Sequence, residues 1–117
     1  MKTNDLKIYK KHLLKAYEIR CVENKFLDLF RKGDIRGTVH TCKGQELLPV
    51  ILQDYLKKTD FILSNHRGHG HFISWTNDKE KLILELLGRE SGVSGGYGGS
   101  QHLKSSGFLS NGIQGGL

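Results

Sequence analysis

Three histidines and one arginine fall within six consecutive positions of this sequence: His66, Arg67, His69 and His71, in the stretch S-N-H-R-G-H-G-H-F (64–72). Imidazole nitrogens bind zinc and exchange protons near neutral pH. A guanidinium group forms charge-assisted hydrogen bonds with phosphate or carboxylate. The residue types therefore leave three kinds of site open: a metal site, a titrating site and a site for an anion.

A metal site would need three or four nitrogen or sulfur ligands. The nominal donors are His40, Cys42, His66 and His69. The charge of Arg67 would oppose a dication, and the spacing H-x-x-H-x-H matches no common structural zinc pattern. The two glycines of the stretch also argue against a helix that would place His66 and His69 on one face. We therefore predict no metal ligands in this chain.

An anion fits the stretch better, because glycines let the backbone approach a ligand while arginine and histidine donate hydrogen bonds to it. From this stretch alone, a solvated polar loop without function is an open alternative. A second candidate, G-V-S-G-G-Y-G-G-S-Q-H (92–102), has five glycines in its first eight residues. It is neither a P-loop nor a dinucleotide fingerprint. Ser100 and His102 at its end could hydrogen-bond a substrate or simply hold the loop.

Apolar periodicity predicts the elements that position these stretches. Residues 5–32 have an apolar stripe at three- and four-residue spacing, which predicts a helix that ends at Gly33. A loop over 33–44 follows, and then a second helix over about 46–57 that holds Pro49 in its first turn. Residues 61–64 are strand-like and lead into the histidine stretch.

A third helix is predicted between Asn77 and Gly88, with Asn77 as N-cap, Glu80 completing a capping box and Gly88 ending the helix. Residues 88–117 then contain ten glycines in thirty positions. Such a segment buries too little apolar surface to offset the entropy of ordering it. We expect it to be flexible, or to lie on a surface that this chain does not supply.

Composition limits the class of protein. A chain of 117 residues is at most one ordinary domain, and its longest apolar run, at 47–52, is too short for a membrane span. The charged N-terminus is unlike a secretory signal, so we expect a soluble protein of the cytoplasm with two reduced cysteines. The net charge of +6 implies an anionic partner, although the lysines are spread out and also fit helix faces that only meet solvent.

Five stretches, taken in order, resemble the alpha subunits of thiamine-diphosphate-dependent 2-oxo acid dehydrogenases, which include the pyruvate, branched-chain and acetoin dehydrogenases. They are residues 19–46, D-F-I-L-S-N-H-R-G-H-G (60–70), E-L-L-G-R-E-S-G (85–92), G-Y-G-G-S-Q-H (96–102) and N-G-I-Q-G-G (111–116). The resemblance covers about residues 15–117. It implies an α/β thiamine-diphosphate-binding fold, of which residues 1–117 would be the N-terminal portion. We expect this portion to be mostly helical over 5–88, with a glycine-rich, cofactor-proximal segment over 89–117.

The resemblance also implies residue roles. Arg67 matches the arginine that binds the diphosphate, and His66 stands where the family has a tyrosine with the same task. Backbone groups of Gly112, Ile113 and Gln114 match positions that hold the aminopyrimidine ring. Three histidines are candidates for the substrate pocket: His40, His69 and His102.

The activity that the resemblance implies is oxidative decarboxylation of a 2-oxo acid, or cleavage of acetoin, with acyl transfer to lipoamide. It needs thiamine diphosphate and Mg²⁺, whose ligands we expect outside this chain. The implied partners are downstream alpha-subunit sequence, a beta subunit in an α2β2 assembly and a lipoyl acyltransferase, with neither a nucleic acid nor a membrane among them. Alone, the chain is expected to be inactive. The alternatives are a divergent, transketolase-like or sugar-modifying enzyme that uses the same cofactor, and a non-catalytic basic module that binds anions or RNA.

Overall fold

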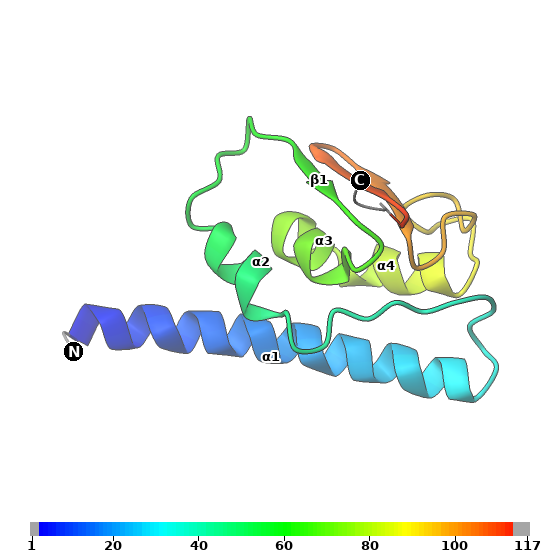
Figure 1. Ribbon diagram of the computed structural model, residues 1–117, viewed down its shortest axis with the longest axis horizontal. Coiled ribbons are helices and arrows are strands. Elements are labelled where there is room, and N and C mark those ends of the chain that lie inside the picture. The colour runs from blue at the N-terminus through cyan, green and yellow to red at the C-terminus, as the bar shows by residue number, and fades with distance from the viewer. Residues whose placement is uncertain (1–2, 114–117) are drawn as a thin grey trace.

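The computed structural model describes residues 3–113, in which three layers lie on one another (Figure 1). The long helix α1 (Thr3–Arg31) forms one side and contacts α2 (Leu47–Leu52). Helices α3 (His69–Thr76) and α4 (Lys79–Leu86) lie between α1 and a small sheet. The strands of that sheet are β1 (Ile62–Ser64), β2 (His102–Ser105) and β3 (Phe108–Asn111).

Two helix ends lie where the sequence predicts them. Gly33 follows α1 in the left-handed conformation, with φ of 81°, and its N–H donates to the Phe30 carbonyl at 3.0 Å. Gly88 follows α4 with φ of 68°, and its N–H donates to the Glu85 carbonyl at 3.0 Å. Glycine adopts this conformation without a Cβ clash, so both predictions from local sequence are confirmed.

Two other helix boundaries differ from the prediction. The helix expected over 46–57 ends at Leu52, although Pro49 lies in its first turn as predicted. The N-cap of α4 is Asp78, whose carboxylate accepts from the N–H of Lys81 at 3.1 Å, and not Asn77. Asn77 instead ends α3, with φ of 56°. The predicted N-cap is therefore wrong by one residue, and so is the capping box, because Asn77 already ends α3.

Helix α3 is the largest departure from the sequence-based expectation, since none of the three predicted helices includes residues 69–76. It includes Gly70, where an added Cβ would lie 3.0 Å from Sγ of Cys42 and 3.1 Å from Cγ of Pro49. Glycine here allows close packing of the helix against the 33–46 loop and α2. No helix holds both His66 and His69, as the glycines indicated, because α3 begins at His69. Gly70 nevertheless lies inside that helix, and the reason for it is tertiary packing.

The sheet is mixed, with strand order β1-β3-β2. β1 runs parallel to β3 in a register that pairs Ser64 with Ser110, and β2 pairs with β3 as an antiparallel hairpin. The strand predicted at 61–64 is confirmed as β1, whereas the hairpin was not predicted. About half of the described residues are helical, as expected for part of such a domain. The complete thiamine-diphosphate-binding fold stays a prediction.

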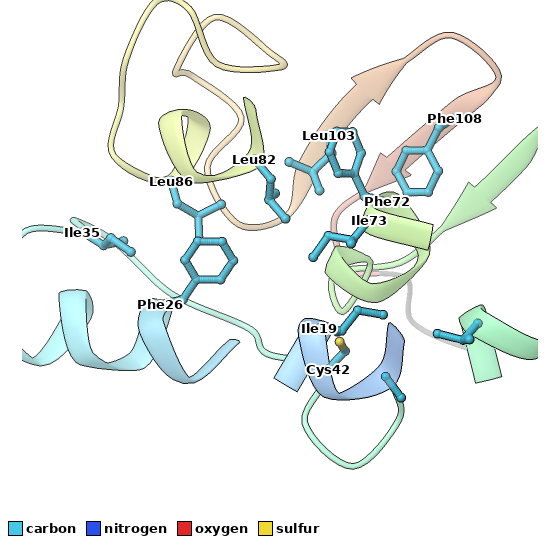
Figure 2. Close-up of a cluster of buried hydrophobic side chains, with 12 residues drawn as sticks. Ile19, Phe26, Ile35, Cys42, Phe72, Ile73, Leu82, Leu86, Leu103 and Phe108 are labelled. Carbon is cyan, nitrogen blue, oxygen red and sulfur yellow. The ribbon is translucent and has the colours of Figure 1, made fainter. Parts of the chain in front are cut away.

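One hydrophobic core joins all three layers (Figure 2). Phe26 of α1 points toward Leu86 of α4, and Phe72 of α3 meets Phe108 of β3 edge to face, with ring centroids 5.5 Å apart. Leu103 of β2 is fully buried in the same core. The described part of the glycine-rich segment, up to residue 113, thus packs on a surface that this chain does supply, and the expectation to the contrary is corrected for that part.

The described helices show no membrane span. None of those between residues 3 and 113 combines the length and the apolar character that crossing a bilayer requires.

Candidate functional site

The parallel pairing of β1 and β3 brings two distant stretches of sequence to one edge of the sheet. Because Ser64 pairs with Ser110, the residues that follow each strand, 65–67 and 112–113, leave the sheet at the same edge. The hydroxyl of Ser110 lies 2.7 Å from the Asn65 carbonyl oxygen and 2.8 Å from that of Gln101. β2 begins beside them, since His102 pairs with Asn111. We call the groups at this edge the edge cluster: His40, His66, Arg67, Gln101, His102, Gly112 and Ile113.

His66 and Arg67 lie in a tight turn between β1 and α3. The side-chain oxygen of Asn65 accepts from the Arg67 N–H at 2.9 Å, and the exposed guanidinium group donates to the carbonyl of Thr41. Nδ1 of His66 is buried and has no hydrogen-bond partner among the described residues. An added Cβ at Gly68 would lie 2.9 Å from Oγ of Ser64, so glycine keeps this turn tight.

His40 reaches the edge cluster from the 33–46 loop. Its ring meets that of His66 edge to face, with centroids 5.2 Å apart, and its Nδ1 lies 3.1 Å from Nε2 of Gln101. Partial burial lowers the pKa of His40, and the nearby His66, Arg67 and His69 lower it further. The neutral ring is therefore favoured, which can accept a proton or donate a hydrogen bond.

His69 lies behind the edge cluster and is fully buried. Its Nδ1 lies 3.0 Å from Oε1 of Glu23, and its Nε2 lies 3.0 Å from both the carbonyl oxygen and Oγ of Ser100. Burial alone would raise the pKa of Glu23, yet its bonds to His69 and to the N–H of Cys42 leave that pKa lowered. His69 has no exposed surface, so its geometry suits holding Ser100 and α1 together.

The remaining predicted residues lie at the ends of the hairpin. The exposed His102 ring covers Gly112, where an added Cβ would lie 2.8 Å from Cε1. The N–H of Gly112 donates to the Gln101 carbonyl at 3.0 Å, and the side chain of Ile113 is exposed. Gln114 lies outside the described residues. Within residues 3–113, no group of three or more potential ligands could hold a metal ion.

Sequence reasoning missed two buried glutamates that organise the site. Glu23 lies in the apolar stripe of α1, in phase with the buried Ile19 and Phe26, and Glu85 lies beside the buried Leu82 of α4. An acidic residue in the phase of a buried stripe is the signal that would have found them, because such a charge stays buried only with partners.

A groove of about 680 Å³ lies away from the edge cluster, between α1, α2 and the end of α3. Lysines line it along α1, at positions 7, 10, 11 and 15. It holds none of the predicted site residues.

A cluster of basic and glycine residues outside the carboxyl ends of parallel strands is where open α/β sheets bind ligands. The family described as Dehydrogenase E1 component matches residues 14–116. The chain belongs to this family, which confirms the resemblance drawn from the sequence.

Relatives of known name agree with this assignment. Over 105 residues the chain is 40% identical to the alpha subunit of acetoin:2,6-dichlorophenolindophenol oxidoreductase from Bacillus subtilis, covering 87% of this chain and 32% of that protein. The pyruvate dehydrogenase E1 component subunit alpha of Rhizobium meliloti is 38% identical over 104 residues, covering 89% and 29%. The mitochondrial counterpart from Kluyveromyces lactis is 35% identical over 115 residues, covering 97% and 27%. The chain thus spans about a third or less of these relatives.

Proposed function

We propose that this chain supplies part of the thiamine-diphosphate site of a 2-oxo acid dehydrogenase alpha subunit, acting on pyruvate, a related 2-oxo acid or acetoin. The main support for the proposal is the placement of two stretches of the chain at the same edge of the sheet. The stretches expected to hold the diphosphate (66–67) and the aminopyrimidine (112–113) are more than forty residues apart, yet both leave the sheet at one edge. Membership of the dehydrogenase family supports the same reading.

The residues at this edge fit such a cofactor. A diphosphate needs cationic donors, and Arg67 presents an exposed guanidinium group beside the turn. Nδ1 of His66 is a buried polar atom without a hydrogen-bond partner in residues 3–113, of the kind that a bound group satisfies. Main-chain groups of Gly112 and Ile113 can hold a pyrimidine ring, as backbone groups do in many cofactor sites.

Thiamine diphosphate, when bound, supplies the carbon nucleophile and the electron sink for decarboxylation. The residues of this chain would bind and orient it. Arg67 and His66 would hold its anionic end, and the neutral His40 ring would hydrogen-bond substrate or exchange a proton beside it. The Mg²⁺ ligands, the beta subunit and the lipoyl acyltransferase that complete the reaction in this proposal would come from other sequence.

Cofactor binding to the complete alpha chain, reconstituted with its beta chain, tests the proposal. Calorimetry with thiamine diphosphate and Mg²⁺ should show that Arg67→Ala weakens binding by at least about tenfold, since a charge-assisted hydrogen bond contributes about 1.5–3 kcal/mol. Arg31→Ala is the matched control, because Arg31 is exposed and its ion-pair partner, Asp28, is a neighbour in the same helix. Equal affinity of wild type and Arg67→Ala would refute the assigned role. RNA binding with a steep salt dependence would instead favour the non-catalytic alternative.

A further inference from the structure

The fully buried carboxylate of Glu85 accepts four backbone hydrogen bonds from the segment that we call the glycine loop, residues 92–99. Oε2 accepts from the N–H groups of Ser94 at 2.7 Å and Gly96 at 2.9 Å. Oε1 accepts from those of Gly98 at 2.7 Å and Gly99 at 3.1 Å. Within residues 3–113, no lysine or arginine forms an ion pair with Glu85.

The number of donors matches the acceptor. An ionised carboxylate has two oxygens with about four lone-pair positions and no proton to place. Glu85 receives four N–H groups, two on each oxygen, so the carboxylate is satisfied without any cation. A glutamine amide would differ at one end, because its NH₂ group would face two N–H donors. The loop therefore distinguishes a glutamate from its closest neutral analogue.

The glycines of the loop allow it to wrap so closely around one side chain. An added Cβ would lie 2.6 Å from Cα of Glu85 at Gly92, and 2.7 Å from the carbonyl oxygen of Arg89 at Gly96. At Gly98 it would lie 1.9 Å from the carbonyl oxygen of His102. These distances exclude any larger residue without a shift of the backbone. The composition that suggested flexibility is thus required by a specific close packing.

The glycine loop leads directly into the edge cluster. Ser100 follows Gly99, and its Oγ accepts from the N–H of His40 at 3.0 Å. Gln101 comes next, with its side chain against the His40 ring and its carbonyl accepting from the N–H of Gly112 at 3.0 Å. A displacement of the loop would therefore be transmitted to both His40 and Gly112.

We propose that Glu85 is a positioning residue for the edge cluster: its carboxylate fixes the glycine loop, and Ser100 and Gln101 carry that placement to His40 and Gly112. This inference rests on the proposed function for its catalytic meaning. It assigns to Glu85, which is fully buried, control over the position and orientation of the His40 ring.

The test compares Glu85→Gln with Glu90→Gln, an exposed glutamate five residues away, in the complete alpha chain assembled with its beta chain. Hydrogen exchange of the backbone amides, measured by mass spectrometry, reports how well the glycine loop is ordered. Exchange of the histidine C2 hydrogen reports the titration of His40. In Glu85→Gln we expect at least tenfold faster amide exchange in residues 92–99, unchanged exchange in residues 69–76, and a changed His40 titration. In Glu90→Gln all three should match wild type.

Three results would overturn the proposal. The first is that Glu85→Gln and Glu90→Gln have the same loop exchange and the same His40 titration. The second is that Glu85→Gln accelerates amide exchange equally in residues 69–76 and 92–99. The third is that the loop amides of the wild-type protein are not protected from exchange. The last needs no variant, so it decides even if Glu85→Gln fails to fold. Gly98→Ala provides a second route, since it should displace the loop while leaving Glu85 intact and should reproduce the His40 change. None of these readouts requires turnover or cofactor, so a failure of the proposed function is seen separately.

Discussion

Nδ1 of His69 lies 3.0 Å from Oε1 of Glu23, and neither side chain is exposed to solvent. The same carboxylate oxygen accepts from the N–H of Cys42 at 3.0 Å, so one acid joins α1, the 33–46 loop and α3. Removing charged groups from water is costly, and a buried pair persists only where its geometry is good and its remaining hydrogen bonds are made. The Glu23 carboxylate therefore couples the first helix to the histidine stretch and to the 33–46 loop.

Replacing that carboxylate should be strongly destabilising. Glu23→Ala leaves His69 buried without its partner and the Cys42 N–H without an acceptor, so the free energy of unfolding should fall by about 3–5 kcal/mol. Alanine favours the helix, so helix propensity cannot explain a loss. Urea unfolding measures the change. The exposed Asn24 provides the control, since Asn24→Ala should change stability by less than about 0.5 kcal/mol. A loss below about 1 kcal/mol in Glu23→Ala would contradict the coupling.

Acid should weaken a second contact between α1 and the 33–46 loop. The guanidinium group of Arg20 pairs with Glu46, with Nη2 3.0 Å from Oε2, and lowers the pKa of Glu46 from 4.5 to about 2. Because the pKa is lower in the folded state, the pair stabilises the fold above about pH 4.5, and this contribution is lost as the pH falls toward 2.

The variant Arg20→Met isolates this contribution. It should be less stable than wild type at pH 6, where Glu46 is ionised and pairs with Arg20. The difference should shrink toward zero near pH 2.5, as urea unfolding at several pH values will measure. Arg31→Met, on the exposed end of α1, should show little difference at any pH. A pH-independent gap between Arg20→Met and wild type would show that the methylene groups, and not the charge, are responsible.

The positive charge of Arg67 should lower the pKa of His40 even without cofactor. Burial lowers the pKa of His40 first, and the positive charge of Arg67 is among the neighbours that lower it further. Arg67→Met should therefore raise the pKa of His40, and its ring should be protonated over a wider pH range. Titration of the His40 ring by NMR measures this. Lys25→Met removes an equal charge from an exposed position on α1 and should leave the titration unchanged. An unchanged His40 titration in Arg67→Met would show that the charge of Arg67 does not affect the His40 ring.

Features that depend on local chemistry were predictable from the sequence, and features that depend on distant partners were not. The ends of α1 and α4 are encoded by single glycines, Gly33 and Gly88, whose backbone freedom acts on their own helix. The ordering of the glycine loop depends instead on Glu85, a buried acid in another element. No periodicity reveals such a pairing.

In the candidate site, too, some features follow from local sequence and others from distant partners. The basic character of residues 66–67 was evident, but their placement beside Gly112 follows from the parallel register of β1 and β3. The sequence suggested that placement only through resemblance to a family, because residue types and spacing do not show which strands pair.

The packing of α3 allows a final prediction. Gly70 lies inside that helix, where alanine would ordinarily be favoured by about 1 kcal/mol. An added Cβ would, however, lie 3.0 Å from Sγ of Cys42 and 3.1 Å from Cγ of Pro49. We expect Gly70→Ala to lower the free energy of unfolding by about 1–2 kcal/mol, since overpacking outweighs propensity. Cys42→Ala should relieve the contact. Burial raises the pKa of the Cys42 thiol, so this change removes volume and no charge. In urea unfolding, the double variant should then lose about 1 kcal/mol less stability than the two single variants lose together. Strict additivity would show that Cys42 is not what excludes a side chain at position 70.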